Sequence, residues 1–154
     1  MMAMTIAGYD PSGGAGILND IKTFHALGVY GTAVITVLTA QNSKRVGEIK
    51  QVPSDFIGKQ IETVLEDIPI KFAKTGMLYS SEIVKLVSEK VVEHDFNLVV
   101  DPVIVAGCGT MLSETGYVES LKEYLLPNAV FLNILRKQNL INGPMLYLIH
   151  FTCH

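Results

Sequence analysis

The chain has 154 residues and a formal net charge of −3 at pH 7, with 49% apolar and 18% charged residues. The acidic balance argues against a nucleic-acid partner, and no apolar run is long enough to cross a membrane. The first residues lack the basic and apolar regions of a signal peptide, and the two cysteines form no recognisable pattern. We therefore expect a globular protein located in the cytoplasm.

Apolar runs and amphipathic segments alternate along the chain. Apolar and β-branched runs predict strands at 4–7, 34–39, 70–74, 98–100 and near Ala129, with a short extra strand at 49–52. Helical spacing of apolar residues predicts helices at 17–27, from Ser54, from Ser80 or Ser81, and at about 113–126. We expect Gly28 to end the first helix, Ser54 to cap the second and Pro127 to stop the last.

This alternation predicts right-handed crossovers and a largely parallel sheet with helices on both faces. In such sheets, ligands bind at the carboxyl ends of the strands. Unusual residues gather at four of these ends: 8–16, 41–42, 75–77 and 101–103. Their clustering predicts a ligand site at one edge of the sheet.

Residues 8–16, between the first strand and the first helix, include four glycines. Glycine lets the backbone approach a ligand closely, although a tight strand-to-helix turn is the alternative explanation. The second strand ends in Ala40-Gln41-Asn42, without the acidic residue of a Rossmann dinucleotide site, and no Walker sequence occurs. A Rossmann-type oxidoreductase is therefore disfavoured.

Five segments together carry a family resemblance. They are A-G-Y-D-P-S-G-G-A-G, K-T-F-H-A-L-G-V-Y-G, T-A-Q-N, K-T-G-M-L and V-V-D-P-V, in this order along the chain. From about Met4 to Val130 the chain resembles the hydroxymethylpyrimidine/phosphomethylpyrimidine kinases of thiamine biosynthesis. The resemblance implies a ribokinase-like α/β fold. It also implies ATP-dependent phosphorylation of 4-amino-5-hydroxymethyl-2-methylpyrimidine and then of its monophosphate, with ATP and Mg²⁺ as cofactors of the full-length family.

The resemblance assigns Gln41 to pyrimidine binding, and the chemistry of its side chain suits that role. An exocyclic amine beside a ring nitrogen offers one donor and one acceptor, which a glutamine amide complements. Gly8, Ala15 and Met77 would line the pocket of the flat ring. Without the resemblance, Gln41 reads as an ordinary solvated amide.

Two acidic residues are further candidates. Asp20, one turn into the first helix, resembles a family acid near the substrate, with a helix-dipole acid or a structural ion pair as alternatives. Asp101 would face the phosphate and Mg²⁺ region, without direct metal ligation. We assign no metal ligand.

The chain departs from the family after about residue 131. Residues 132–154 lack the expected acidic segment, glycine-rich anion hole and catalytic base, so we assign no catalytic residue and no certain cofactor to this chain. Residues 1–131 are expected to be the N-terminal part of a kinase domain and 132–154 a divergent tail. Bases that encode Leu135-Arg136-Lys137-Gln138 can encode Glu-Glu-Ala-Glu in another frame, which suggests a shifted reading frame near Leu132.

Several functional expectations follow from this departure. The 154-residue chain is expected to be inactive alone, although its family is one of phosphotransferases. A non-catalytic or unstable pyrimidine-binding fragment and a pyridoxal kinase-like protein are the alternatives. An exposed sheet edge is expected to cause self-association or homo-oligomer formation.

Overall fold

In the computed structural model, which describes residues 1–133, six strands form one sheet in the order β3-β2-β1-β4-β5-β6. The strands are β1 (Met2–Tyr9), β2 (Tyr30–Gln41), β3 (Val46–Gln51), β4 (Phe72–Thr75), β5 (Asn97–Val100) and β6 (Ala129–Leu132). All neighbours are parallel except β3, which runs antiparallel to β2. The predicted parallel sheet with one short extra strand is confirmed.

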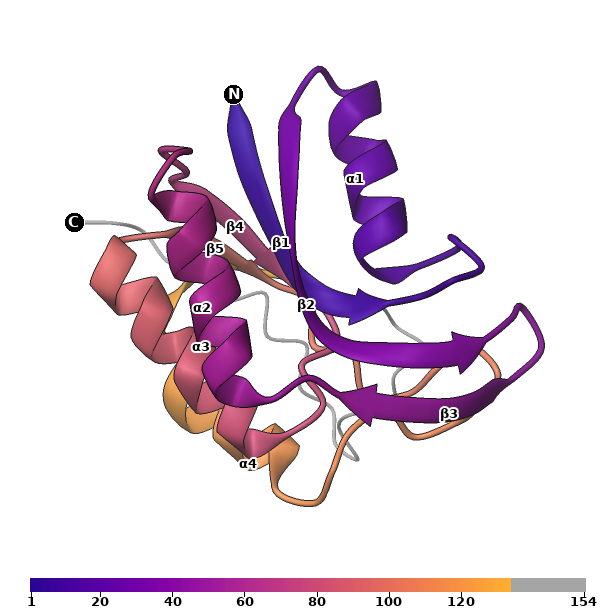
Figure 1. Cartoon of the computed structure of the whole chain (residues 1–154). Helices are drawn as coiled ribbons and strands as arrows, with labels where there is room; N and C mark the ends of the chain where they lie inside the picture. The colour runs from indigo at the N-terminus through magenta and orange to yellow at the C-terminus, as the bar shows by residue number, and fades with distance from the viewer. Residues whose placement is uncertain (134–154) are drawn as a thin grey trace.

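The helices cover both faces of this sheet, as predicted. They are α1 (Gly16–Ala26), α2 (Ser54–Leu65), α3 (Ser81–His94) and the short α4 (Tyr117–Ser120). Figure 1 shows α1 on one side of the sheet and the other three helices on the opposite side. None of the helices within residues 1–133 is both long enough and apolar enough to span a bilayer.

Two predicted helix starts need correction. Ser54 is the first residue of α2 and not its cap, because Pro53 occupies the capping position and the Ser54 hydroxyl donates to Glu82 instead. The last helix begins at Tyr117, four residues later than predicted, because Gly116 takes a φ of +84° that an α-helix does not allow. By contrast, Ser80 caps α3 as predicted, with its hydroxyl accepting from the Ile83 N–H at 3.4 Å.

The end of that last helix also differs from a regular α-helix. Residues Leu121–Leu125 form a wider π turn, and Leu126–Asn128 form a 3₁₀ turn that contains Pro127. Proline has no N–H to donate, and its ring would meet the carbonyl four residues earlier. The predicted stop at Pro127 is therefore confirmed, with a change of helical geometry before it.

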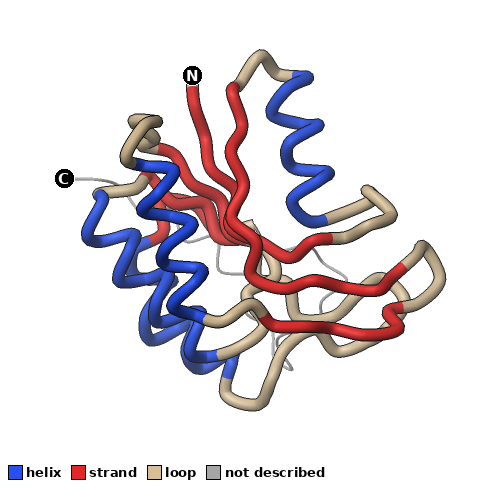
Figure 2. The backbone as a smooth tube through the Cα atoms, viewed as in Figure 1, coloured by secondary structure: helices blue, strands red, loops and turns tan. Residues whose placement is uncertain are grey.

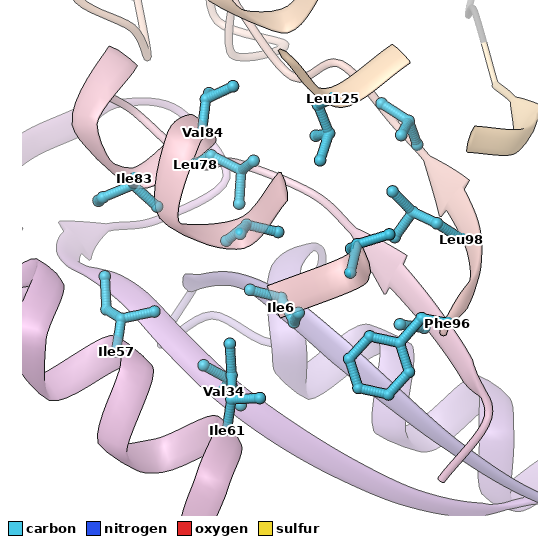
Figure 3. Packing of buried hydrophobic residues seen from close by; sticks show 14 of the residues in the cluster. Ile6, Val34, Ile57, Ile61, Leu78, Ile83, Val84, Phe96, Leu98 and Leu125 are labelled. Carbon is cyan, nitrogen blue, oxygen red and sulfur yellow. The ribbon is translucent and has the colours of Figure 1, made fainter. Parts of the chain in front are cut away.

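The main hydrophobic core lies between the sheet and the helices α2, α3 and α4. Figure 3 shows Ile6 and Val34 of the sheet facing Ile57 and Ile61 of α2, all of them fully buried. Ile83, Val84 and Leu98 belong to the same cluster. A second, smaller cluster contains Val37, Met77 and Leu112.

The face that carries α1 is less completely covered. Helix α1 packs on β1 and β2, where Gly31 leaves room for it: a β-carbon at Gly31 would lie 2.8 Å from atoms of both Ile21 and Phe24. Figure 2 shows no second described helix on this side of the sheet. Phe72 of β4 and Phe131 of β6 are consequently 46% and 60% exposed within the described part of the chain.

Candidate functional site

The glycine-rich bend begins at Gly8, which lies between two side chains of the smaller cluster. A β-carbon at Gly8 would be 2.9 Å from Val37 Cγ2 and 3.3 Å from Met77 Sδ. Real β-carbons essentially never approach other atoms as closely as the first of these distances. The sequence therefore keeps this position free of a side chain, and Met77 lies directly beside it.

The other end of the bend, Gly16, lies against its beginning. Gly16 has a φ of +58°, and a β-carbon there would overlap the carbonyl oxygen of Gly8. Gly13 also has a positive φ, of +70°, and its carbonyl accepts from Lys22 Nζ at 3.1 Å. Close packing within the protein alone thus requires glycine at both positions, against side chains at position 8 and against backbone at position 16, so the tight-turn explanation accounts for part of the motif.

The carboxylate of Asp10 holds the bend together. Its Oδ1 accepts from the Ser12 N–H at 2.8 Å and from the Ser12 hydroxyl at 2.7 Å, while Oδ2 accepts from the Ala15 N–H at 3.0 Å. Ala15 occupies the capping position of α1 and has no acceptor of its own, and Asp10 binds the N–H of Ala15 itself, at the residue where the helix begins. Asp10 is 5% exposed, which is unusual for a carboxylate and fits its several donors.

Asp10 also connects the bend to the end of β2. Burial by itself would raise the pKa of the Asp10 carboxyl, but hydrogen bonds from Ser12, Ala15 and the Gln41 side chain outweigh burial and lower the pKa below its ordinary value. The Thr39 hydroxyl adds a second connection by donating to the Tyr9 carbonyl at 2.9 Å. Figure 1 shows the loop between β1 and α1 beside the ribbon formed by β2 and β3.

The structure therefore brings most of the predicted pyrimidine-site residues to one rim. Gln41 is the last residue of β2, Gly8 begins the bend and Met77 follows β4. The end of β2 meets the bend through the Thr39 hydroxyl, two residues before Gln41, and Met77 meets the bend at Gly8. Ala15 lies at the far end of the bend and is exposed.

Asp20 takes part in an ion pair on the α1 face. Its two carboxylate oxygens lie 3.0 Å and 2.9 Å from Lys74 Nζ, and the Thr5 hydroxyl donates to Oδ2 at 2.6 Å. Thr5 and Lys74 are register partners on β1 and β4, so α1 places Asp20 above both. A structural ion pair is one of the interpretations that the sequence leaves open for Asp20.

The same ammonium group lies near Asp101, at the end of β5. Asp101 Oδ2 is 3.7 Å from Lys74 Nζ. Burial raises the pKa of the Asp101 carboxyl above its ordinary value, and Lys74 offsets only part of this rise. Two carboxylates thus share one ammonium, which leaves a net negative charge in a partly buried place.

The described residues do not fit a metal ion held at this edge by the protein alone. Within residues 1–133, the group of three side chains with metal-ligand spacing is Glu62, Glu93 and His94, on helices α2 and α3. Lys90 already pairs with both glutamates of that group, at 2.7 Å from Glu93 Oε2. We therefore assign no metal ligand to the strand-end edge and derive no step through one.

Sequence reasoning misses two residues of this site. It places Asp10 in the glycine-rich bend without a role of its own, although an aspartate two residues before a serine is a known turn former and could have indicated that role. It places Lys74 in a strand, and nothing in the local sequence indicates that Asp20 and Asp101 come to this lysine. Such contacts depend on how α1 packs over the sheet.

The sheet order and the helices on both of its faces define an α/β protein of the ribokinase-like class. A solved phosphomethylpyrimidine kinase from Clostridium difficile 630 matches with a TM-score of 0.79 and 44% identity, over 86% of this chain and 58% of that one. A pyridoxal kinase from Staphylococcus aureus in complex with pyridoxal matches with a TM-score of 0.74 and 36% identity, over 85% of this chain and 47% of that one. The predicted fold class is confirmed.

Sequence comparison gives the family. The phosphomethylpyrimidine kinase family model matches residues 10–141. The hydroxymethylpyrimidine/phosphomethylpyrimidine kinase of Salmonella typhimurium (strain LT2) is 41% identical over 145 residues, which are 92% of this chain and 54% of that protein. The chain belongs to the phosphomethylpyrimidine kinase family and spans about half the length of this relative.

Proposed function

We propose that this chain supplies the pyrimidine-binding part of an ATP-dependent kinase of thiamine biosynthesis. Its substrates would be 4-amino-5-hydroxymethyl-2-methylpyrimidine and the monophosphate of that alcohol. The observation that carries this proposal is the hydrogen bond that joins the end of β2 to the glycine-rich bend, from the Thr39 hydroxyl to the Tyr9 carbonyl at 2.9 Å. Gln41, two residues after Thr39, and the backbone of the bend then lie on one rim.

The proposed binding step uses the two edges of the Gln41 amide. The carbonyl oxygen accepts from the exocyclic amine of the pyrimidine, and an amide N–H donates to the adjacent ring nitrogen. The ring lies along the backbone of Gly8 and against Met77, whose thioether adapts to an aromatic face. Loss of a buried partner costs on the order of 1–3 kcal/mol, so the amide favours this pattern over its reverse.

Phosphoryl transfer itself also needs stabilisation of the transferred group and a base near the accepting hydroxyl. ATP would supply the phosphoryl group, and Mg²⁺ would neutralise part of its charge. The role proposed for the residues of this chain is to bind and orient the pyrimidine. We expect the 154-residue chain alone to bind without phosphorylating, and its cytoplasmic location and the boundary at residue 132 stay predictions.

A calorimetric titration with the pyrimidine alcohol tests the proposal. The wild-type chain should bind, and Gln41→Leu should weaken binding by about tenfold or more, since a lost pair of hydrogen bonds costs at least about 1.4 kcal/mol. Asn19→Leu is a matched control, because it removes an exposed amide from the first turn of α1, outside the bend. Equal affinity of the wild type and Gln41→Leu would refute the proposed role of Gln41.

Pyridoxal is the second candidate substrate, because the Staphylococcus aureus enzyme of 36% identity binds it in its solved structure. Pyridoxal has no amine beside its ring nitrogen and offers Gln41 a different hydrogen-bonding pattern. The same titration with pyridoxal distinguishes the two candidates. Tighter binding of pyridoxal than of the aminopyrimidine would favour a pyridoxal kinase-like protein.

A further inference from the structure

Strand β2 contains a β-bulge before its end at Gln41. Ile35 pairs with Ala7 of β1 and Leu38 pairs with Tyr9, so β2 advances by three residues while β1 advances by two. Such bulges are rare between parallel strands and are over-represented beside active sites, where they redirect side chains. Figure 1 shows β2 changing direction before it runs beside β3.

The side chain of Gln60, on α2, holds the residue at the start of this bulge. Gln60 Oε1 accepts from the Ile35 N–H at 2.9 Å, and Gln60 Nε2 donates to the Ile35 carbonyl at 3.1 Å. One amide thus pairs with both polar groups of the Ile35 backbone. The bulge is therefore fixed to the body of the protein from the side of α2.

The Thr36 hydroxyl fixes the bulge to the segment that follows β4. It donates to the Met77 carbonyl at 2.6 Å, and Thr36 is fully buried. The pairing of β4 with β1 ends at Thr75, so the Met77 carbonyl lies beyond the ladder and needs another partner. Thr36 supplies this partner and joins the strand that ends at Gln41 to the residue beside Gly8.

Two side chains that border Gly8 depend on this hydrogen bond. Val37 follows Thr36 directly, and Met77 carries the accepting carbonyl. Both belong to the smaller buried cluster, and their nearest atoms would lie 2.9 Å and 3.3 Å from a β-carbon at Gly8. A movement of the bulge relative to Met77 would also move Gln41, which ends the same strand.

We propose that Thr36 is a positioning residue for pyrimidine binding. Its hydrogen bond to the Met77 carbonyl sets the distance between the Gln41 amide and the Met77 thioether, so that one flat ring can contact both. This inference rests on the proposed function. Thr36 acts through these two residues and does not touch the ligand.

The test compares Thr36→Val with the wild type in calorimetric titrations with 4-amino-5-hydroxymethyl-2-methylpyrimidine. Valine keeps the shape of threonine and removes the hydroxyl, so the Met77 carbonyl loses its partner. Affinity should fall by about three- to tenfold, because binding must then also order the two contacts at a cost of the order of one hydrogen bond. Unchanged affinity would overturn the inference and leave the proposed function standing. A wild-type chain that does not bind would refute both.

Ser88→Ala is the matched control for lost stability. The Ser88 hydroxyl donates to the Tyr124 carbonyl, also at 2.6 Å, and Ser88 is buried in the middle of α3. Like Thr36→Val, this variant should be less stable than the wild type, but it should keep the affinity of the wild type. An equal loss of affinity in both variants would show that a general loosening of the fold is responsible and would contradict the inference.

The nuclear magnetic resonance signal of the Met77 methyl group provides a measurement that lost stability alone does not change. A bound aromatic ring shifts the signal of a neighbouring methyl group by an amount that depends on their relative position. At saturating ligand, this shift should differ between Thr36→Val and the wild type, and it should be the same in Ser88→Ala and the wild type. An equal shift in Thr36→Val and the wild type would overturn the inference.

Thr36→Ser keeps the inference testable if Thr36→Val does not fold. Serine retains the hydroxyl and loses a buried methyl group, so Thr36→Ser should be less stable than the wild type. Its ligand affinity and the shift of its Met77 signal should nevertheless match those of the wild type. If Thr36→Ser loses both, the packing of residue 36 and not its hydrogen bond positions Met77, and the inference is wrong.

Discussion

The backbone of Gly16 lies so close to the carbonyl oxygen of Gly8 that a β-carbon at position 16 would overlap this oxygen. The first turn of α1 is thereby held against the end of β1. The two ends of the bend are in contact, and the residues between them form a closed loop beside the end of β2.

Gly16→Ala should therefore destabilise the chain more than alanine at another glycine of similar conformation. Gly28 is the matched control, since its φ of +71° resembles the +58° of Gly16 but a β-carbon at Gly28 would have no other atom within 4 Å. Gly28→Ala should cost about 1–2 kcal/mol from backbone strain alone. Gly16→Ala should cost about 1–3 kcal/mol more, from overpacking. Denaturant unfolding of both variants measures the difference, and equal costs would contradict the close contact.

Gly8→Ala should both destabilise the chain, by about 1–3 kcal/mol from overpacking, and weaken ligand binding. Its added methyl group would displace Val37 or Met77, and Met77 is the side chain proposed to contact the ring. Gly58→Ala in α2 is the control, because a β-carbon there makes an ordinary 3.6 Å contact with Leu86 of α3. We expect Gly58→Ala to stabilise the chain by about 0.5–1 kcal/mol and to leave ligand affinity unchanged. Unchanged ligand affinity in Gly8→Ala would argue against a ring beside this position.

The sequence predicts the strands, most helices and the rim of the candidate site for a physical reason. Buried strands such as β2 carry continuous β-branched runs, and parallel strands bring their carboxyl ends to one edge. The predicted convergence of Gln41 with the bend needs only this rule. The contacts of Lys74 could not be predicted, because they depend on the packing of α1 over β1 and β4.

The last helix shows a second limit of sequence reasoning. Its apolar spacing is helical from about residue 113, yet the helix begins only after Gly116. The Glu114 N–H donates to the Tyr79 carbonyl at 2.9 Å, so residues before Gly116 are held by a tertiary hydrogen bond. Local spacing carries no information about that partner.

The two acidic residues with shifted pKa values should give opposite pH dependence. The folded-state pKa of Asp10 is lowered from 3.8, so its stabilising contribution is present above pH 3.8 and is lost as the pH falls through the folded value. Asp10→Asn should therefore flatten the loss of stability on the acid side. Denaturant unfolding across acidic pH tests this. If Asp10→Asn lost as much stability as the wild type when the pH falls, the result would contradict the prediction.

Asp101 supplies the comparison with the opposite sign. Its folded-state pKa is raised from 3.8, so its contribution is fully present below pH 3.8 and is lost as the pH rises through the folded value. The stability difference between the wild type and Asp101→Asn should thus change in the direction opposite to that for Asp10→Asn. If the stability difference from the wild type changed with pH in the same direction for both variants, burial would not be the dominant influence on the pKa of Asp101.

Lys74→Met should destabilise the chain at neutral pH. Removal of its ammonium leaves the carboxylates of Asp20 and Asp101 without their shared cation. Because all three side chains are partly exposed, we expect a cost on the order of 1–3 kcal/mol, below that of a fully buried pair. Adding Asp20→Asn to Lys74→Met should recover part of the lost stability, because one unpaired carboxylate is removed. If the stability effects of the two substitutions simply added, Lys74 and Asp20 would not be coupled.

The exposed edge of the sheet should promote self-association. Val130 and Phe131 of β6 are 48% and 60% exposed, and β6 pairs only with β5 within the described residues. Sedimentation should detect species larger than a monomer, and Phe131→Glu should reduce their share, because a charge on an edge strand opposes pairing. A wild-type chain that sediments as a monomer at every concentration would refute this prediction.

A crystal structure of the chain with 4-amino-5-hydroxymethyl-2-methylpyrimidine tests the central claim most directly. The account predicts that the ring lies beside Gly8 and Met77, with its exocyclic amine donating to Gln41 Oε1. A ring bound elsewhere on the chain, or a Gln41 amide turned away from the ligand, would contradict it.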